Sequence, residues 1–402
     1  MSFTRRRVLT FEMIVITILR KGVCSLQNTL NTFFHEHTLS LVTSAALSKA
    51  RKNLGHTAFI ALNQSIVDLF YAESHKRFHG LRICAVDGSK VLLPHNEEMR
   101  AAFGSTTIHN QRSDDLGSYT FSLASVLYDV LNSITLDATL NHGDSYEVDV
   151  AAQHLSRVQK DDLVLFDRGY CSFRIMHVMA QSKGDFLVRC SRASFKEAKR
   201  LFADAEIHDL TTTLVSNQKY RNHYGSDTSP LAVRFVKVTL ATGEVEVLAT
   251  SLLDVEKYPT ELFRELYWMR WGVEGLYGIL KTRLELENFS GKSVESIRQE
   301  FHAAIFLTTL ESVLTHDDNI ELGKKGTLNV QKINTAQAFR SIKEKVFELL
   351  VSDMSTDVIL NELTEVFLKR PTIHASHKHP PRRRASATRL LNFARRMKKR
   401  VF

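Results

Sequence analysis

Three acidic residues occupy positions from which their carboxylates could act together. Asp87 interrupts an otherwise apolar run, Asp167 ends a short apolar segment, and Glu274 lies in a stretch with helical periodicity. Carboxylates at the ends of two buried strands, with a third on a helix beside the core, are a recurring way to hold Mg²⁺, which prefers oxygen ligands. Two such ions, about 3.5–4 Å apart, can activate a water or a 3′-hydroxyl for phosphodiester cleavage. Three converging carboxylates without metal would repel one another.

Each acid also has an ordinary explanation. Asp87 alone could be a turn residue, Asp167 could cap the next helix, and Glu274 could belong to a solvated face whose ion pairs contribute a few tenths of a kcal/mol. Their joint occurrence in this order favours a metal site.

A row of charged and aromatic residues surrounds the third acid. On a continuous helix beginning near Pro259, Tyr267, Arg270, Glu274 and Lys281 fall within an arc of roughly 60° and span about 21 Å. The neighbouring arc is apolar, which predicts that the row borders a buried seam. Arg270 and Lys281 could therefore hold the phosphates of a DNA strand.

Three glycines lie on the flank of this helix opposite the apolar seam. Gly272, Gly275 and Gly278 each cost about 1 kcal/mol relative to alanine inside a helix. Glycine there indicates that another backbone or a bulky ligand comes close.

The period of apolar residues divides the chain into regions. Residues 1–80 and 295–370 show helical spacing, whereas 81–190 alternates strands with helices and 231–253 predicts a hairpin. This pattern predicts an α/β fold flanked by helical regions. The helix expected at 44–54 would expose Lys49, Arg51 and Lys52, and it could read DNA. A plain helical hairpin with solvated lysines fits these residues equally well.

Charge is concentrated at the C-terminal end of the chain. The formal net charge is +9, yet twelve Lys and Arg residues and no acid fall between Lys369 and Arg400. The basicity therefore belongs to a tail at 371–402, which predicts a polyanion-binding or disordered arm.

The cysteines and the apolar runs bear on the cellular compartment. Four scattered cysteines without a Cys-x-x-Cys pair argue against a zinc ribbon and are usual in a reduced compartment. Glu12 and the basic pair after Leu19 argue against a signal peptide. No apolar run reaches the ~18 residues needed to span a bilayer. We expect a soluble cytoplasmic protein without a membrane partner.

The motifs around the three acids resemble a known family. The spacing Tyr267-x2-Arg270-x3-Glu274-x6-Lys281 is similar to the Tyr-Arg-Glu-Lys signature of the insertion-sequence-four family of bacterial DDE transposases. Asp87-Gly-Ser and Asp167-Arg-Gly-Tyr resemble the two aspartate motifs of that family. Trp271 also matches, and the resemblance covers most of residues 40–310.

The resemblance implies an RNase H-like mixed-sheet catalytic core with a mainly β insertion. The implied regions are a DNA-binding domain (1–80), a core (81–190 and 256–300) split by the insertion (191–255), and a C-terminal helical region (301–370) that could mediate multimerisation. Members act as multimers, usually dimers on paired ends. They bind terminal inverted repeats, cut with Mg²⁺ and join the 3′ ends to target DNA, which implies a nucleoid-associated protein.

The resemblance also assigns residues. Asp87, Asp167 and Glu274 would ligate two Mg²⁺ ions, with Mn²⁺ as a substitute. The residues that we expect to contact DNA are Tyr267, Arg270, Trp271, Lys281 and Arg168, together with the N-terminal Lys49, Arg51 and Lys52.

One feature departs from the family. Well-studied relatives release the element through a DNA hairpin and hold a flipped base against an aromatic ring in the insertion. The expected strand 244–253 has no aromatic residue. Either Tyr258 or Trp268 replaces that ring, or the hairpin step is absent.

Three other functions fit these residues to different degrees: an ATPase, a nuclease and an inert DNA-binding protein. Gly291-Lys-Ser293 resembles the end of a P-loop, but Leu286 stands where that motif needs glycine. A metal-dependent nuclease without strand joining would use the same carboxylates. An inert, transposase-derived DNA-binding protein would have no need to keep all three acids.

Overall fold

The computed structural model describes residues 8–22, 24–73, 75–109, 115–225, 229–240, 242–325 and 330–374. The chain forms two compact units. The sheet unit consists of Ser74–Lys90 and Leu123–Tyr277, and the helical unit consists of Met1–Glu73, Val91–Ser122 and Gly278–Phe402.

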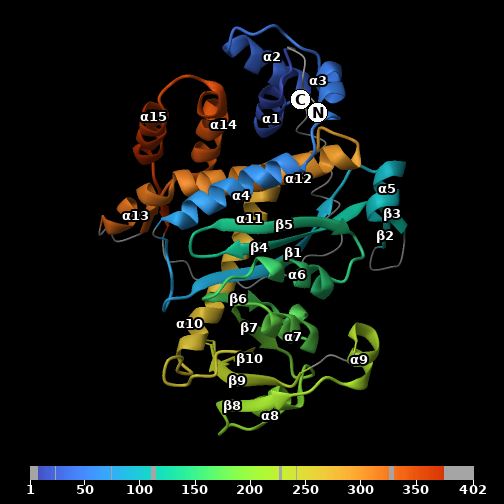
Figure 1. Ribbon diagram of the computed structural model, residues 1–402, viewed down its shortest axis with the longest axis vertical. Coiled ribbons are helices and arrows are strands. Elements are labelled where there is room, and N and C mark those ends of the chain that lie inside the picture. Colours follow the sequence, from blue (N-terminus) through green and yellow to red (C-terminus); the bar gives the residue numbers. More distant parts are fainter. Residues whose placement is uncertain are drawn as a thin grey trace. The chain divides into compact units, whose positions relative to one another are not determined.

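A mixed sheet of eight strands dominates the first unit, in the order β5-β4-β1-β6-β7-β10-β9-β8 (Figure 1). Its strands are β1 (Arg82–Leu92), β4 (Phe121–Asp129), β5 (Ile134–His142), β6 (Asp162–Phe166), β7 (Asp185–Cys190), β8 (Asp209–Leu214), β9 (Leu231–Thr239) and β10 (Val245–Thr250). Strands β1, β6 and β7 run parallel, whereas β7, β10, β9 and β8 pair antiparallel in turn. This mixed sheet with flanking helices confirms the predicted α/β class and is consistent with an RNase H-like core.

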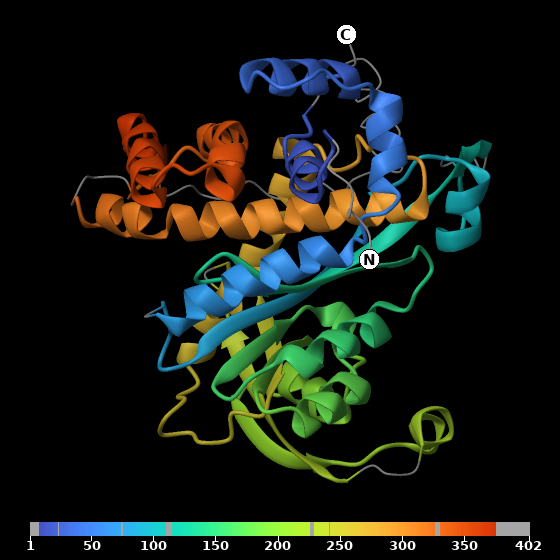
Figure 2. The ribbon, with the colours of Figure 1, turned by 45° about the horizontal axis from the view of Figure 1, so that its top comes forward.

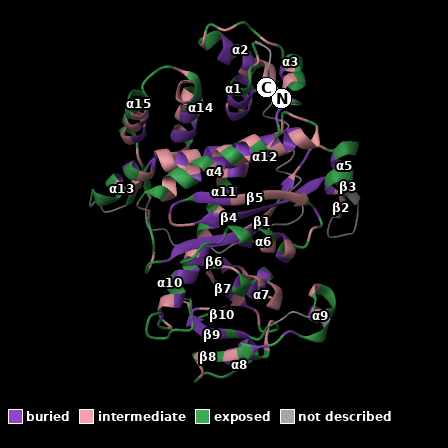
Figure 3. Cartoon of the chain, in the orientation of Figure 1, coloured by how far each residue is buried: buried purple, intermediate pink, exposed green. Residues whose placement is uncertain are grey.

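The central strands are continuous apolar runs. Ile83–Val86 in β1 and Leu163–Phe166 in β6 are fully buried (Figure 3). Such runs are typical of parallel strands covered on both faces. Their parallel register pairs Val86 with Phe166. The two predicted aspartates therefore follow paired residues.

Short helices connect the strands of the sheet unit. They are α6 (Glu147–His154), η1 (Leu155–Arg157), η2 (Arg168–Tyr170), α7 (Phe173–Gln181), α8 (Lys196–Ala203) and α9 (Gln218–Tyr224). The region predicted as a β insertion contains β8, β9 and β10, and β10 pairs with β7 through Val247 and Cys190. These strands thus extend the sheet itself. The division into functional domains stays a prediction.

The stretch after Pro259 is helical without a break from Leu262 to Arg283, as predicted, but it is not one regular α-helix. It consists of α10 (Leu262–Trp268), a 3-10 turn η3 (Met269–Trp271), α11 (Gly272–Gly278) and a π-helical turn η4 (Ile279–Arg283). The angle per residue differs in 3-10 and π turns. The charged row therefore does not lie on a single ideal helical face.

Helices make up most of the second unit. They are α1 (Phe11–Leu19), α2 (Leu26–Glu36), α3 (Ser44–Arg51), α4 (Thr57–Ala72), α5 (Glu97–Phe103), α12 (Val294–Leu314), α13 (His316–Lys324), α14 (Thr335–Val351) and α15 (Thr356–Lys369). Two small ribbons accompany them, β2 (Thr106–His109) with β3 (Asp115–Tyr119) and β11 (Val330–Lys332) with β12 (Thr372–His374).

Helix α12 is the centre of the helical unit. It is largely buried, and a capping box between Ser293 and Ser296 fixes its start. Helix α4 packs along it, as Figure 2 shows. One apolar cluster joins Phe306 on α12 to Ile14 on α1 and Phe33 on α2. The predicted helical regions at both ends of the chain thus share one core.

The basic tail falls almost entirely outside the described residues. Thr372–His374 forms β12, but residues 375–402 are not described. Within the described part of the chain, no helix is both long and apolar enough to cross a membrane.

Candidate catalytic carboxylate site

Asp87 and Asp167 lie side by side on two neighbouring strands. Only Asp167 stands at a strand end, because β1 continues past Asp87 to Leu92, so the expectation that both strands end at their acid was wrong for Asp87. Asp87 follows Val86 in β1, Asp167 follows Phe166 in β6, and Val86 and Phe166 are register partners. Because the strands are parallel and their paired register ends at Val86 and Phe166, both aspartates stand at the same level of the sheet. The prediction that two strands deliver two carboxylates to one place is consistent with this register.

The environment of Asp87 disfavours its ionised form. Burial raises the pKa of Asp87, and the carboxylates of Asp167 and Glu147 raise it further. The guanidinium of Arg270 and the backbone N–H of Gly88 act in the opposite direction, and the result is a pKa of about 6. Removal of the carboxylate from water is the main cause of this rise, and the nearby like charges add to it.

Asp167 is held as a carboxylate by donors around it. Although burial alone would raise its pKa, the backbone N–H of Arg168 and the guanidinium groups of Arg189 and Arg270 bring it below the usual value. Arg189 on β7 donates from Nη2 to Oδ1 of Asp167 at 2.8 Å. The Tyr267 hydroxyl lies 3.4 Å from the same oxygen. Tyr267 therefore stands beside a predicted metal ligand.

Arg189 is a site residue that sequence reasoning missed. Besides Asp167, its guanidinium binds Oε1 of Glu246 on β10 at 2.8 Å and lies 5.9 Å from the centre of the Tyr267 ring. In the sequence Arg189 is one polar residue inside a strand. Only the pairing of β7 between β6 and β10 places it next to Asp167.

Glu274 is joined to the two aspartates through Arg270. Nη2 of Arg270 donates to Oε1 of Glu274 at 2.9 Å, and the guanidinium carbon lies 4.1 Å from the centre of the Trp271 ring. The same cation lowers the pKa of both Asp87 and Asp167. Arg270 is thus a buried counter-ion shared by all three predicted acids.

Glu147 brings a fourth carboxylate to the site. A Cβ on Gly88 would stand 3.6 Å from the carboxyl carbon of Glu147 and 3.2 Å from the hydroxyl of Tyr170. Glycine after Asp87 therefore permits a close approach of both side chains. Sequence reasoning missed Glu147 because it carries no motif; it is simply the first residue of α6.

The site offers the oxygen donors that Mg²⁺ prefers. Among the described residues, no group of three or more His, Cys, Asp or Glu side chains is arranged to hold a metal ion. Glu274 is paired with Arg270 in this structure. Burial and the neighbouring carboxylates raise the pKa of Asp87 despite Arg270, and a bound cation would favour its ionised form. The donor set is therefore suited to a divalent cation if Glu274 leaves Arg270.

Two other predicted DNA contacts differ in their surroundings. Arg168, directly after Asp167, is exposed. Lys281 belongs to the helical unit, where its ammonium lies 3.8 Å from Oε1 of Glu287. Burial lowers the pKa of Lys281, and Glu287 partly offsets that effect.

The N-terminal basic residues separate into two kinds. Lys49 and Lys52 are exposed as predicted, but Arg51 is buried, so the expectation that it faces solvent was wrong. Its guanidinium bonds Gln299 at 2.9 Å and Glu300 at 3.1 Å on α12. Arg51 is therefore engaged in fixing α3 to the core.

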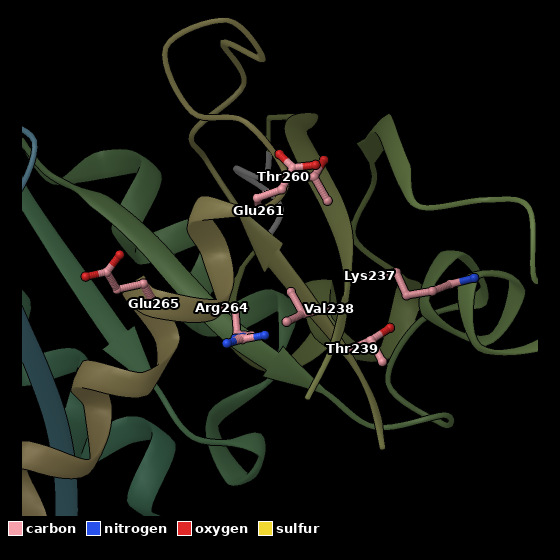
Figure 4. A pocket seen from close by; sticks show the side chains of 7 residues that line it. All are labelled: Lys237, Val238, Thr239, Thr260, Glu261, Arg264 and Glu265. Atoms are coloured by element: carbon pink, nitrogen blue, oxygen red, sulfur yellow. The ribbon is translucent and has the colours of Figure 1, made fainter. Parts of the chain in front are cut away.

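A pocket of about 450 Å³ lies elsewhere in the sheet unit. It is lined by Lys237, Val238 and Thr239 on β9 and by Thr260, Glu261, Arg264 and Glu265 around the start of α10 (Figure 4). Figure 4 shows Lys237 and Glu265 extending away from each other on opposite sides of Arg264. None of the three predicted acids lines this pocket, and its mixed charges do not converge on one point. We therefore do not assign it to the carboxylate site.

Two adjacent aspartates on a sheet, with a glutamate on a following helix, are the arrangement expected of a DDE domain. The family model described as "Transposase DDE domain" matches residues 78–310. The chain belongs to this transposase family, which confirms the resemblance found in its motifs.

Individual relatives are distant. The chain is 22% identical over 275 residues to the transposase InsG for insertion sequence element IS4 of Escherichia coli (strain K12), covering 67% of this chain and 60% of that protein. It is 28% identical over 154 residues to the putative transposase y4zB of Sinorhizobium fredii (strain NBRC 101917 / NGR234), covering 36% and 40%. The chain thus spans about half the length of these curated relatives.

A solved structure with a similar path is the cryo-EM structure of the piggyBac transposase synaptic complex with hairpin DNA. The TM-score is 0.40 at 11% identity, and the match covers 90% of this chain and 79% of that one.

Proposed function

We propose that the chain is a cut-and-paste transposase of a bacterial insertion sequence. It binds the terminal inverted repeats of its element, cuts the ends by Mg²⁺-dependent hydrolysis and joins the 3′ ends to target DNA. The observation that carries the proposal is the shared counter-ion. Arg270 pairs with Glu274, opposes the rise in the pKa of Asp87 and helps to lower the pKa of Asp167, so one positive charge acts on all three acids.

In this proposal Asp87, Asp167 and Glu274 hold two Mg²⁺ ions, or Mn²⁺ in their place. The ions supply an activated water or 3′-hydroxyl and positive charge for the leaving oxygen. Glu274 would leave Arg270 to serve as a metal ligand, and the guanidinium of Arg270 would then be available to a phosphate of the DNA. Tyr267 and Arg189 keep Asp167 oriented, which is supported by their contacts with its Oδ1.

The remaining DNA contacts follow from exposure and charge. Arg168 beside Asp167, and Lys49 and Lys52 on the N-terminal helices, are exposed cations available to phosphates. Trp271 and Lys281 belong to the same signature and contact DNA near the cut end. We propose a homodimer on paired ends as the active form.

The hairpin step requires an aromatic ring that a flipped base can reach. Tyr258 is 5% exposed, whereas Trp268 is 58% exposed. Base stacking on an aromatic face contributes about 1–3 kcal/mol. We therefore propose Trp268 as the stacking ring, and its replacement by alanine should block hairpin formation without blocking the first nick.

The experiment first searches the DNA that flanks the reading frame for short inverted repeats, and the repeats found there provide the substrate. Asp87→Asn, Asp167→Asn and Glu274→Gln should each abolish Mg²⁺-dependent end cleavage while end binding in a mobility-shift assay is retained. Asp149→Asn is the matched control, because Asp149 binds Tyr224 and Arg174 instead. Full cleavage by any of the three variants would contradict the assignment. Cleavage by the wild type without joined products would instead favour the nuclease alternative.

A further inference from the structure

We propose that Cys171 and Cys190 form an oxidation-sensitive thiol pair that closes to an intrachain disulfide when the protein meets a peroxide. The two sulfur atoms lie 3.5 Å apart, although 19 residues separate them in sequence. Both cysteines are free thiols in the structure. This inference does not depend on the proposed function.

The fold brings the two thiols together. Cys171 ends the 3-10 turn η2 that follows β6, and Cys190 is the last residue of β7. Strands β6 and β7 pair in parallel, so the segment leaving β6 passes the end of β7. A disulfide needs the sulfurs at roughly 2.05 Å, which a small side-chain movement of about 1.5 Å would achieve.

The two cysteines differ in the way that a reactive pair requires. Cys171 is partly exposed, whereas Cys190 is buried. Hydrogen bonds from Cys190 and Ser194 lower the pKa of Cys171, and the contact with Cys171 raises the pKa of Cys190. The ionised thiolate form of cysteine reacts with peroxide, whereas a buried cysteine that stays protonated is inert. Cys171 is therefore the attacking thiol and Cys190 the resolving thiol.

The chemistry is balanced with hydrogen peroxide as the oxidant. The Cys171 thiolate attacks one peroxide oxygen, the O–O bond breaks, and Cys171 sulfenic acid and hydroxide form. The sulfur of Cys190 then attacks the sulfur of that sulfenic acid, and the S–S bond forms as the S–O bond breaks. The hydroxyl group takes up the proton of the Cys190 thiol and leaves as water. Two thiols are oxidised to one disulfide, and one peroxide is reduced to two waters overall.

The disulfide would form close to the carboxylate site. Arg189, which precedes Cys190, binds Asp167 at 2.8 Å, and Cys171 follows the turn that begins after Asp167. The covalent link would tie the segment after Asp167 to β7. Oxidation should therefore hold Asp167 against Arg189 and slow its release to any other partner.

The other two cysteines provide internal controls. Cys24 is exposed and would give intermolecular disulfides, so the experiment uses the full chain with Cys24→Ser. Cys84 has no exposed surface within β1. After exposure to hydrogen peroxide, Cys84 should still be alkylated by iodoacetamide once the protein is denatured.

The measurement is peptide mapping without reductant. Peroxide treatment should produce a linked pair of tryptic peptides, residues 169–174 with 190–192, and dithiothreitol should release it. In Cys190→Ala the reaction should stop at Cys171, where dimedone traps the sulfenic acid. Undiminished alkylation of both Cys171 and Cys190 in the Cys24→Ser protein would overturn the proposal. That readout needs no substitution in the core, so poor folding of Cys190→Ala leaves the test intact.

Discussion

Arg270 donates a hydrogen bond of 2.9 Å to Glu274, one helical turn further along the chain. The guanidinium is 3% exposed and also counteracts the rise in the pKa of Asp87. An ion pair between residues four apart usually stabilises a helix by a few tenths of a kcal/mol. Here the cation is buried among acids, where removing one partner of a charge pair costs far more.

Replacing Arg270 by glutamine should make the protein depend on divalent cations. Without the guanidinium the three acids lose their shared counter-ion, so the melting temperature in EDTA should fall. Added Mg²⁺ should then raise the melting temperature of Arg270→Gln by more than it raises that of the wild type, because bound cations stabilise the folded state. Differential scanning fluorimetry measures both shifts. Arg168→Gln, at an exposed position, is the control, and equal Mg²⁺ increments in Arg270→Gln and wild type would argue against the counter-ion.

Replacement of Arg51 by alanine should destabilise the protein far more than replacement of its neighbours Lys49 and Lys52. Lys21 and Arg51 both bind Glu300, at 2.8 and 3.1 Å, and together they overcome the effect of burial to set its pKa to about 2. Arg51→Ala should therefore cost about 3–5 kcal/mol in urea unfolding, as expected for a broken buried pair.

Lys49→Ala and Lys52→Ala should leave the unfolding free energy within about 0.5 kcal/mol, because both side chains are exposed. If these lysines contact phosphates, each variant should weaken DNA binding and reduce the slope of log K against log salt by about one. An unchanged salt slope would remove Lys49 and Lys52 from the DNA interface.

Glu311 in α12 should make stability depend on pH. Burial raises its pKa from 4.5 to about 7. The folded state therefore favours the protonated acid, so this stabilising contribution is complete below pH 4.5 and is lost as pH rises through about 7. The contribution of Glu311 to the free energy of unfolding therefore falls by roughly 3 kcal/mol at most between low and high pH. The free energy of unfolding in urea should be compared between Glu311→Gln and the wild type at each pH. Relative to the wild type, the variant should be more stable at pH 8 than at pH 5. Parallel pH profiles for the two proteins would contradict this.

Two glycines of α11 should differ on substitution. A Cβ on Gly272 would stand 3.1 Å from Cβ of Val130, whereas no heavy atom of the described chain lies within 4 Å of a Cβ on Gly275. Gly275→Ala should therefore stabilise the free protein by up to about 1 kcal/mol, and Gly272→Ala should gain less. Gly275→Leu tests whether this flank admits a DNA backbone or a second subunit. Normal cutting and joining by Gly275→Leu would mean that neither approaches there.

Much of the fold was predictable from local patterns. Continuous apolar runs such as Ile83–Val86 predicted central strands, and three- and four-residue spacing predicted the helices at both ends of the chain. These signals are local, because burial on both faces of a strand or on one stripe of a helix constrains residue type along the sequence. The helix after Pro259 was the exception, since its 3-10 and π turns at η3 and η4 leave no clear mark in residue spacing.

The sequence by itself determined which residue types the site contains, because Asp87, Asp167 and Glu274 occur in motifs whose order and spacing are specific. Only the tertiary structure decided what surrounds them. Strand pairing brings Arg189 to Asp167, and the approach of α6 to β1 brings Glu147 to Gly88. The same packing buries Arg51, which the sequence presented as exposed. Electrostatic partners depend on distances between strands and helices that are far apart in the chain, and no local pattern encodes those distances.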